Sequence, residues 1–420
     1  MIFGEIFYAI FLILSLFIYW AVDSKLRVGV IAASGVAFYA YYANYWVLLL
    51  VGITLVSWAT LLWSPLQVAV GNGTAASSAP LQNNRHSNAL AIAFHGKTES
   101  NFSQGLALAT IPIFVCILGY FKYGGFIRSI FTGGEVQPVI VPLAISFFTF
   151  EFIHVAYEKY KGNLEKVSLL DYFSFIFFFP TMIAGPIKRY GQFSQQLEAA
   201  TLTAKDFLEG LFRIILGLTK KVVIADNLNT YIQEIGSPEK TQNTVLLSGA
   251  IFLYGFRIYM DFSGYSDIAI GSARLFGIKV PENFNYPYLQ TNITAFWRHW
   301  HISLYTWLVD YVYIPLGGSR VGVSRALLNV LITMVISGIW HGAAWNFILW
   351  GLWHGILLVI HKIYADSVKP NIKPDVLQGK YYQVLSYLLT MVAVWFGWCL
   401  FMWPLADVSR YLQLLVRAVT

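Results

Sequence analysis

Long apolar runs separated by short polar stretches dominate the chain. The runs cover residues 2–20, 28–42, 45–63, 103–121, 138–157, 170–186, 207–225, 244–262, 296–316, 326–343, 344–362 and 383–404. A helix of about 20 apolar residues is long enough to cross the hydrocarbon core of a bilayer. The pattern therefore predicts an all-α polytopic membrane protein with roughly 10–12 transmembrane or re-entrant helices.

One segment, residues 283–318, is too polar for a simple lipid-facing helix. It carries Arg298, His301 and Asp310 among many aromatic side chains. Polar or irregular chain at membrane depth is tolerated where it is buried in protein or lines a water-filled cavity. We therefore expect this segment to be buried, to re-enter the membrane, or to line a cavity.

Composition agrees with a membrane protein and excludes several other classes. Hydrophobic residues make up 57% of the 420 residues and charged residues 12%, against about 25% charged in soluble domains. This balance excludes a soluble enzyme, a disordered chain and a disulfide scaffold. The net charge of +7 comes without a long basic run, so we expect no nucleic-acid partner.

The chain reads as a single integral membrane domain over residues 1–420. The motifs described below lie within residues 146–355. A polar loop rich in Gly, Ser and Asn occupies about 64–102. No internal repeat is detectable, which weakens the case for an inverted-repeat transporter.

His341 is the strongest candidate for chemistry. It lies in Ser337–Asn346 (SGIWHGAAWN), inside an apolar stretch that offers no ion-pair partner nearby. Titratable residues in spanning segments are costly and mark functional sites. An imidazole titrates near neutral pH and can take a proton from a hydroxyl. The alternative is a neutral core histidine bonded to a carbonyl or hydroxyl group.

A second cluster surrounds His301, in Phe296–Leu304 (FWRHWHISL). On one continuous helix, residues 297, 301 and 304 would share a face, so His301 would project beside Trp297. The alternative is an aromatic anchor at the membrane interface with a snorkelling Arg298. His299 and His301 also have a metal-binding spacing, but only Asp310 is nearby as a third ligand, so we expect no metal.

Two further clusters have less specific signals. Asp261 and Asp267 close an apolar segment and suit either a cavity wall or a solvated helix end. Around residues 178–189, prolines and a glycine break the helix, and a Lys-Arg pair is expected at an interface. Glu151 and His154 lie one turn apart and could pair with each other.

Four strings resemble the membrane-bound O-acyltransferase family, most closely its bacterial branch of polysaccharide acetylases. They are FFPTMIAGPIKRY, YMDFSGYSDIAIG, ENFNYPYLQTNITAFWRHWHISLYTWLVDYVYIPLGG and GIWHGAAWNFILWGLWHG. They occur in the family's order. At His299, relatives often have another polar or basic residue.

The resemblance implies a helical funnel that spans the bilayer and moves an acyl group from a thioester to a hydroxyl. The family's essential histidine falls on His341 and its second active-site position on His301. The donor would be acetyl-CoA or an acyl-carrier thioester, with no bound cofactor. In the bacterial inner membrane, the acetyl group would pass toward an exported polysaccharide such as alginate. A periplasmic or surface SGNH-type acyltransferase would be the partner, and membrane lipid surrounds the chain.

Other residues are candidates to hold the histidine tautomers, to bind substrate or to line the channel. They are Asp310, Asp261, Asn283, Trp297, Arg298, Ser303, Trp340 and Asn346. Within the family, peptidoglycan O-acetylation and D-alanyl transfer to teichoic acid are the competing functions. Outside it, a transporter or flippase would explain buried histidines without chemistry, and a purely structural partner-binding subunit is a further alternative.

Overall fold

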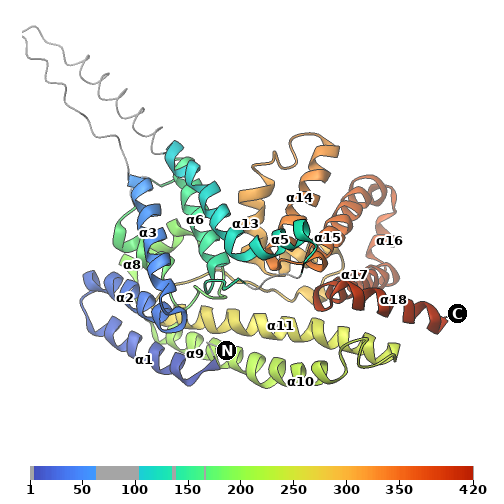
Figure 1. Cartoon of the computed structure of the whole chain (residues 1–420), viewed down its shortest axis with the longest axis horizontal. Coiled ribbons are helices and arrows are strands. Elements are labelled where there is room, and N and C mark those ends of the chain that lie inside the picture. Colours follow the sequence, from blue (N-terminus) through green and yellow to red (C-terminus); the bar gives the residue numbers. More distant parts are fainter. Residues whose placement is uncertain (1–3, 63–103, 135–138, 165–166, 420) are drawn as a thin grey trace, which may run out of the picture.

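The structure is a computed structural model that describes residues 4–62, 104–134, 139–164 and 167–419 (Figure 1). The predicted polar loop at 64–102 lies outside these residues. The described chain is helical, with an isolated β-bridge between Phe284 and Trp300. This confirms the prediction of an all-α fold.

The first part of the chain comprises the elements that precede α9 (Ala204–Leu218). Its elements are α1 (Ile6–Ala21), α2 (Ser24–Ala43), α3 (Trp46–Leu62), the helical segment Gln104–Thr132 with η2 (Gly119–Tyr123) and α5 (Gly124–Thr132), α6 (Ile145–Tyr160), α7 (Leu169–Ile176) and α8 (Tyr190–Ala199).

The rest of the chain includes the long helix α11, which runs along the lower part of Figure 1 beside α9 and α10. Its elements are α9 (Ala204–Leu218), η3 (Thr219–Ala225), α10 (Asp226–Ile235), α11 (Thr244–Leu275), η4 (Pro287–Leu289), α12 (Ile293–His299), α13 (Ile302–Leu308), η5 (Val309–Tyr313), α14 (Val323–His341), α15 (Trp345–Ile363), η6 (Tyr364–Val368), η7 (Lys369–Asn371), α16 (Pro374–Gln378), α17 (Lys380–Met402) and α18 (Leu405–Val419).

Six described helices are long and apolar enough to cross a membrane. They are Ser24–Ala43, Gln104–Thr132, Thr244–Leu275, Val323–His341, Trp345–Asn371 and Lys380–Met402, and α1 and α3 are shorter apolar helices. The protein is thus a multi-pass membrane protein. Fewer helices than predicted meet these criteria because the predicted segments 138–157, 170–186 and 296–316 form shorter helices. Segment 207–225 belongs to the continuous helical run of α9, η3 and α10, which carries several charged residues.

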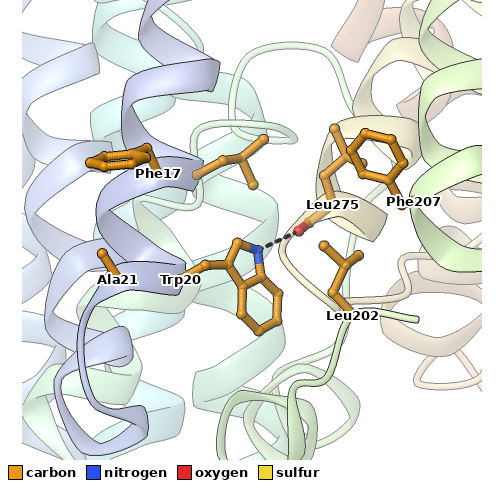
Figure 2. Close-up of a pocket in the computed structure, with 7 residues that line it drawn as sticks. Phe17, Trp20, Ala21, Leu202, Phe207 and Leu275 are labelled. Atoms are coloured by element: carbon orange, nitrogen blue, oxygen red, sulfur yellow. Dashed lines mark hydrogen bonds between the residues drawn. The ribbon is translucent and has the colours of Figure 1, made fainter. Parts of the chain in front are cut away.

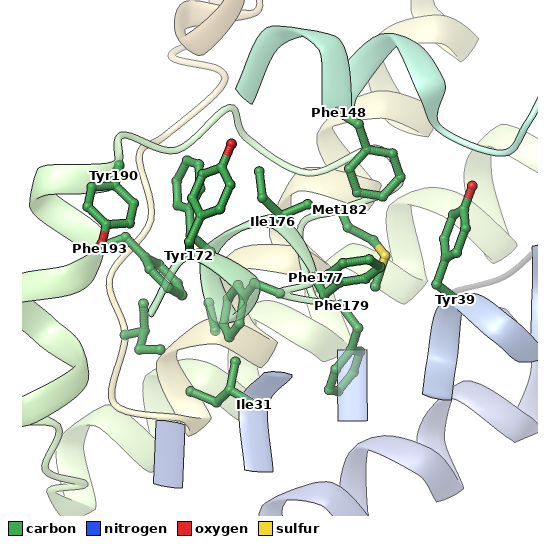
Figure 3. Close-up of a cluster of buried hydrophobic side chains, with 14 of the residues drawn as sticks. Ile31, Tyr39, Phe148, Tyr172, Ile176, Phe177, Phe179, Met182, Tyr190 and Phe193 are labelled. Carbon is green, nitrogen blue, oxygen red and sulfur yellow. The ribbon is translucent and has the colours of Figure 1, made fainter. Parts of the chain in front are cut away.

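A large aromatic core joins α2, α6, α7 and α8 (Figure 3). Phe177 and Phe178, which follow α7, are fully buried. α2 passes very close to them: a Cβ added at Gly35 would lie 1.6 Å from the carbonyl oxygen of Phe177. The chain after α7 is therefore held against α2 by direct backbone contact.

α9 and α11 cross with their backbones in contact at two pairs of glycines. A Cβ at Gly271 would lie 2.5 Å from the carbonyl oxygen of Gly210, and a Cβ at Gly264 would lie 2.8 Å from that of Gly217. In a membrane, lipid is as apolar as leucine, so helices associate through close packing rather than the hydrophobic effect. The glycines permit that packing.

We expect Gly271→Ala to destabilise the protein, because the added methyl group must displace the backbone of Gly210. Overpacking of this kind costs about 1–3 kcal/mol. Gly249→Ala on the same helix is the matched control, since no atom lies within 4 Å of its added Cβ. Thermal unfolding of both variants in detergent measures the effect, and equal midpoints would contradict the proposed packing role.

Candidate functional site

His341 lies at the C-terminal end of α14. Gly342 is extended, with φ −170°, and ends the helix before α15 begins at Trp345. The half-buried imidazole packs edge-on against Trp350 and Phe401, with ring centroids 4.9 and 5.0 Å away. Within the described residues, no hydrogen bond to either ring nitrogen of His341 is formed. Both nitrogens are therefore available to a bound molecule.

His301 lies in a sharp turn rather than on a continuous helix. α12 ends at His299, Trp300 is extended, and His301 itself has φ 46° before α13 begins. The expectation that residues 297, 301 and 304 share one helical face is therefore wrong. A non-glycine residue in this left-handed region costs about 1–2 kcal/mol, so other contacts must hold the turn.

Asn283 supplies those contacts. Its backbone carbonyl accepts a hydrogen bond from the N–H of Ile302 at 2.9 Å. Its side-chain Oδ1 accepts from the backbone N–H and the hydroxyl of Ser303, at 3.2 and 2.7 Å. The amide Nδ2 donates to Ser266 Oγ at 3.1 Å. Asn283 is fully buried, so it fixes the turn from inside the protein.

The same asparagine assigns the tautomer of His301. Because Asn283 Oδ1 accepts from the N–H of Ser303, it is the carbonyl oxygen of the side chain. The Nδ1 of His301, 3.3 Å from that oxygen, must then carry the proton. This leaves a free lone pair on Nε2, which is buried and has no hydrogen-bond partner among the described residues. A buried free lone pair can accept a hydrogen bond from a bound hydroxyl group.

Trp340 brings the two histidines together. Its ring centroid lies 4.7 Å from that of His341 and 6.2 Å from that of His301. Trp297 is buried, and its ring centroid lies 5.5 Å from that of Trp350. The site thus combines two imidazoles with buried and half-buried indole rings.

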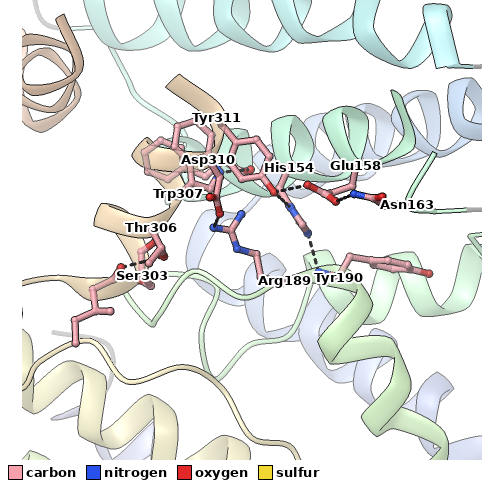
Figure 4. Close-up of polar contacts among 12 residues, drawn as sticks. His154, Glu158, Asn163, Arg189, Tyr190, Ser303, Thr306, Trp307, Asp310 and Tyr311 are labelled. Atoms are coloured by element: carbon pink, nitrogen blue, oxygen red, sulfur yellow. Dashed lines mark hydrogen bonds and ion pairs between the residues drawn. The ribbon is translucent and has the colours of Figure 1, made fainter. Parts of the chain in front are cut away.

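Four other candidates lie apart from the histidines. Asp310 pairs with Arg189 at 2.8 Å (Figure 4), and Asp261 pairs with Lys221 at 2.5 Å. Neither carboxylate contacts His301 or His341 in the described part of the chain. Arg298 is exposed, and Asn346 donates to the carbonyl of Leu400 at 3.2 Å. The ion pairs of Asp310 and Asp261 and the hydrogen bond of Asn346 are therefore with residues other than the two imidazoles.

A buried ion pair supports the His301 turn from the other side. Lys188 and Glu151 pair while buried, and the Lys188 ammonium lies 4.4 Å from the Phe175 ring centroid. One residue earlier, the N–H of Ile187 donates to Ser303 Oγ at 3.0 Å. The prediction that Lys188 lies at the membrane interface is wrong, because its side chain is buried in the protein and paired with Glu151.

The expected pairing of Glu151 with His154 is also wrong. His154 Nε2 accepts from the backbone N–H of Tyr190 at 2.8 Å, so its Nδ1 donates to the hydroxyl of Tyr311 at 2.6 Å. That hydroxyl donates to Glu158 at 2.9 Å (Figure 4). The chain of hydrogen bonds ties α6 to η5 and to the start of α8.

Sequence reasoning missed Lys122 and Tyr123. Both follow the apolar segment predicted at 103–121 and belong to the π-helical turn η2. Lys122 donates to the carbonyl of Trp340, and Tyr123 donates to the carbonyl of Ile339 at 2.8 Å. A lysine at the end of an apolar run was the available signal, but such a lysine is usually a membrane-interface residue.

The apolar cavity in Figure 2 is a different kind of feature. Its volume is about 380 Å³, and it lies between α1 and the ends of α9 and α11. Trp20 donates to the carbonyl of Leu275 at its wall, at 3.0 Å. No titratable side chain lines it. Among the described residues, no cluster of three or more His, Cys, Asp or Glu could hold a metal ion.

Removal of either partner of the buried pair should cost about 3–5 kcal/mol, because the remaining charge is buried without compensation. Glu151→Leu and Lys188→Leu should therefore each lower the thermal unfolding midpoint strongly. The double variant should recover most of the loss, since no unpaired charge remains. A double variant as unstable as the sum of the two single variants would contradict this account.

Comparison with known proteins adds an independent line of evidence. Residues 7–403 match the family described as MBOAT, membrane-bound O-acyltransferase family. The chain is 33% identical to a probable alginate O-acetylase AlgI of Pseudomonas aeruginosa, over 95% of the chain and 71% of the relative. It is 38% identical to a protein of the same name in Azotobacter vinelandii, over 76% of the chain and 64% of the relative. A peptidoglycan O-acetyltransferase of Helicobacter pylori is 38% identical, over 68% of the chain and 60% of that relative.

Proposed function

The chain belongs to the membrane-bound O-acyltransferase family, and from this membership we propose that it transfers an acetyl group from a thioester donor to a hydroxyl group. The donor is acetyl-CoA or an acyl-carrier thioester. The relatives named as alginate O-acetylases favour an exported polysaccharide as the final acceptor.

The observation that carries the proposal is the meeting of His341 and His301 at one indole wall, Trp340. A thioester is already activated, so transfer needs alignment, removal of one proton and exclusion of water. Alignment can supply about 7–11 kcal/mol of the barrier, and general base catalysis about 10²–10⁴-fold. Two imidazoles in a mostly apolar aromatic setting meet these needs.

The proposed chemistry gives each histidine a separate role. The reacting hydroxyl of the acceptor donates to His341. A second hydroxyl of the same acceptor donates to the free Nε2 lone pair of His301, which orients the acceptor. His341 takes the hydroxyl proton while the oxygen attacks the thioester carbonyl carbon. The carbon–sulfur bond then breaks, and the sulfur leaves as a thiolate that takes up the proton. Because Nε2 of His301 carries no proton in this tautomer, it accepts a hydrogen bond and does not stabilise an oxyanion.

We also propose a cellular setting. The chain acts in the bacterial inner membrane and receives the acetyl group on the cytoplasmic side. It passes the group toward a periplasmic or surface SGNH-type acyltransferase, which completes the transfer to polymer. The family resemblance and the multi-pass fold support this setting.

Peptidoglycan O-acetylation is the second candidate, favoured by the Helicobacter pylori relative. The two functions share a donor and differ in the acceptor. Membranes from cells with and without the chain, compared for acetyl groups on exopolysaccharide and on peptidoglycan, separate them. Acetate lost from peptidoglycan alone would replace our first candidate with the second.

His341→Ala should abolish donor consumption. In nanodiscs supplied with radiolabelled acetyl-CoA, we expect the rate to fall by at least about 10²-fold, as loss of a general base implies. His361→Gln is the matched control, because His361 contacts Thr294 and lies outside the site. Equal consumption in wild type and His341→Ala would remove His341 from the chemistry.

The same assay distinguishes the donors. Wild type that ignores acetyl-CoA but consumes an acetylated carrier protein identifies the carrier thioester as donor. Consumption of a D-alanyl carrier instead would favour D-alanyl transfer. Binding or movement of substrate without any transfer, unchanged in His341→Ala, would favour a transporter over an enzyme.

A further inference from the structure

Two neighbouring side chains of η2 reach the end of α14, far away in the sequence. The ammonium of Lys122 donates to the backbone carbonyl of Trp340 and to Ser146 Oγ, the latter at 3.3 Å. The hydroxyl of Tyr123 donates to the carbonyl of Ile339 at 2.8 Å. These two carbonyls directly precede His341.

These contacts provide hydrogen-bond donors for backbone carbonyls that have no partner within the helix. The last four carbonyls of an α-helix have no partner within the helix, and α14 ends at His341. Ile339 and Trp340 are two of those residues. The C-terminal end of a helix also carries partial negative charge, which a cation stabilises. Lys122 and Tyr123 therefore cap α14 from another segment.

Lys122 has no carboxylate partner among the described residues. It is half-buried in a helix long and apolar enough to span the membrane. A cation in that position is costly and marks a function. Its ammonium also lies 5.4 Å from the centroid of the Trp340 ring. It thus contacts both the backbone and the side chain of the residue that joins the two histidines.

The π-helical turn explains how two consecutive residues make these contacts. A π turn inserts an extra residue into an α-helix and occurs frequently at functional sites. η2 interrupts the helix Gln104–Thr132 at the point where it passes α14. The wider turn lets Lys122 and Tyr123 both reach the same helix end.

We propose that Lys122 and Tyr123 form a clamp that positions His341 for acyl transfer by holding the last turn of α14. The inference rests on the proposed function. Both are positioning residues, because they act through the backbone of Ile339 and Trp340. Loss of the clamp lets the end of α14 fray and moves His341 and Trp340 relative to His301.

Lys122→Met should lower kcat by about 10²-fold, the effect of a small misplacement of a catalytic group. The KM for the donor should change less than twofold, because the clamp acts through the position of His341. Lys122→Arg should restore much of kcat by keeping a cationic donor. Tyr123→Phe should give a smaller loss, since it removes one neutral hydrogen bond. Lys362→Met is the matched control, because Lys362 pairs with Asp366 outside the site.

Hydrogen exchange tests the clamp independently of activity. In Lys122→Met, amide exchange should rise in the peptide that contains His341 and stay unchanged in a peptide from α17. If wild type transfers acetyl groups and Lys122→Met keeps its kcat and its exchange pattern, the clamp is overturned while the proposed function stands. If wild type is inactive with every donor, the proposed function fails, and the exchange measurement still decides whether the clamp exists.

Discussion

The contact between α14 and α15 at Gly338 and Gly351 determines the geometry of the candidate site. A Cβ at Gly338 would lie 2.3 Å from the carbonyl oxygen of Phe347, and one at Gly351 would lie 2.4 Å from that of Met334. The backbones of α14 and α15 are therefore in direct contact at these two glycines. His341 lies nearly one turn beyond Gly338, and Trp350 precedes Gly351. The rings of His341 and Trp350 are in contact because no side chain at either glycine holds the two helices apart.

The bilayer explains why this protein depends on such contacts. Between helices in lipid, close packing and internal hydrogen bonds replace the hydrophobic effect. A broken helix at membrane depth is tolerated only where protein satisfies its backbone. The turn at His301 meets this condition through Asn283, Ser303 and the segment that follows the buried Lys188. The buried polar residues around the site thus stabilise the non-helical turn that places His301 in the site.

Sequence patterns predict the class of fold and the residues that meet at the site, but not the local geometry. The apolar runs give an all-α membrane protein, and His341 and His301 stand out because titratable residues are rare there. The break at His301 is not predictable from helical periodicity, because tertiary bonds from Asn283 hold a left-handed residue. The predicted pairing of Glu151 with His154 is wrong for the same reason: the two lie one turn apart, but distant segments supply their contacts. The π turns also depend on tertiary contacts and leave no periodic signal.

The two histidines share an arrangement that follows from these constraints. Each lies where a helix stops, His341 at the end of α14 and His301 between α12 and α13. A helix end has unpaired backbone groups, so side chains from elsewhere can bind it and set its direction. Lys122 does this beside His341, and Asn283 does it at His301. Since the two ends belong to different elements and both histidines contact Trp340, their relative position depends on these distant polar contacts as much as on the residues of the site.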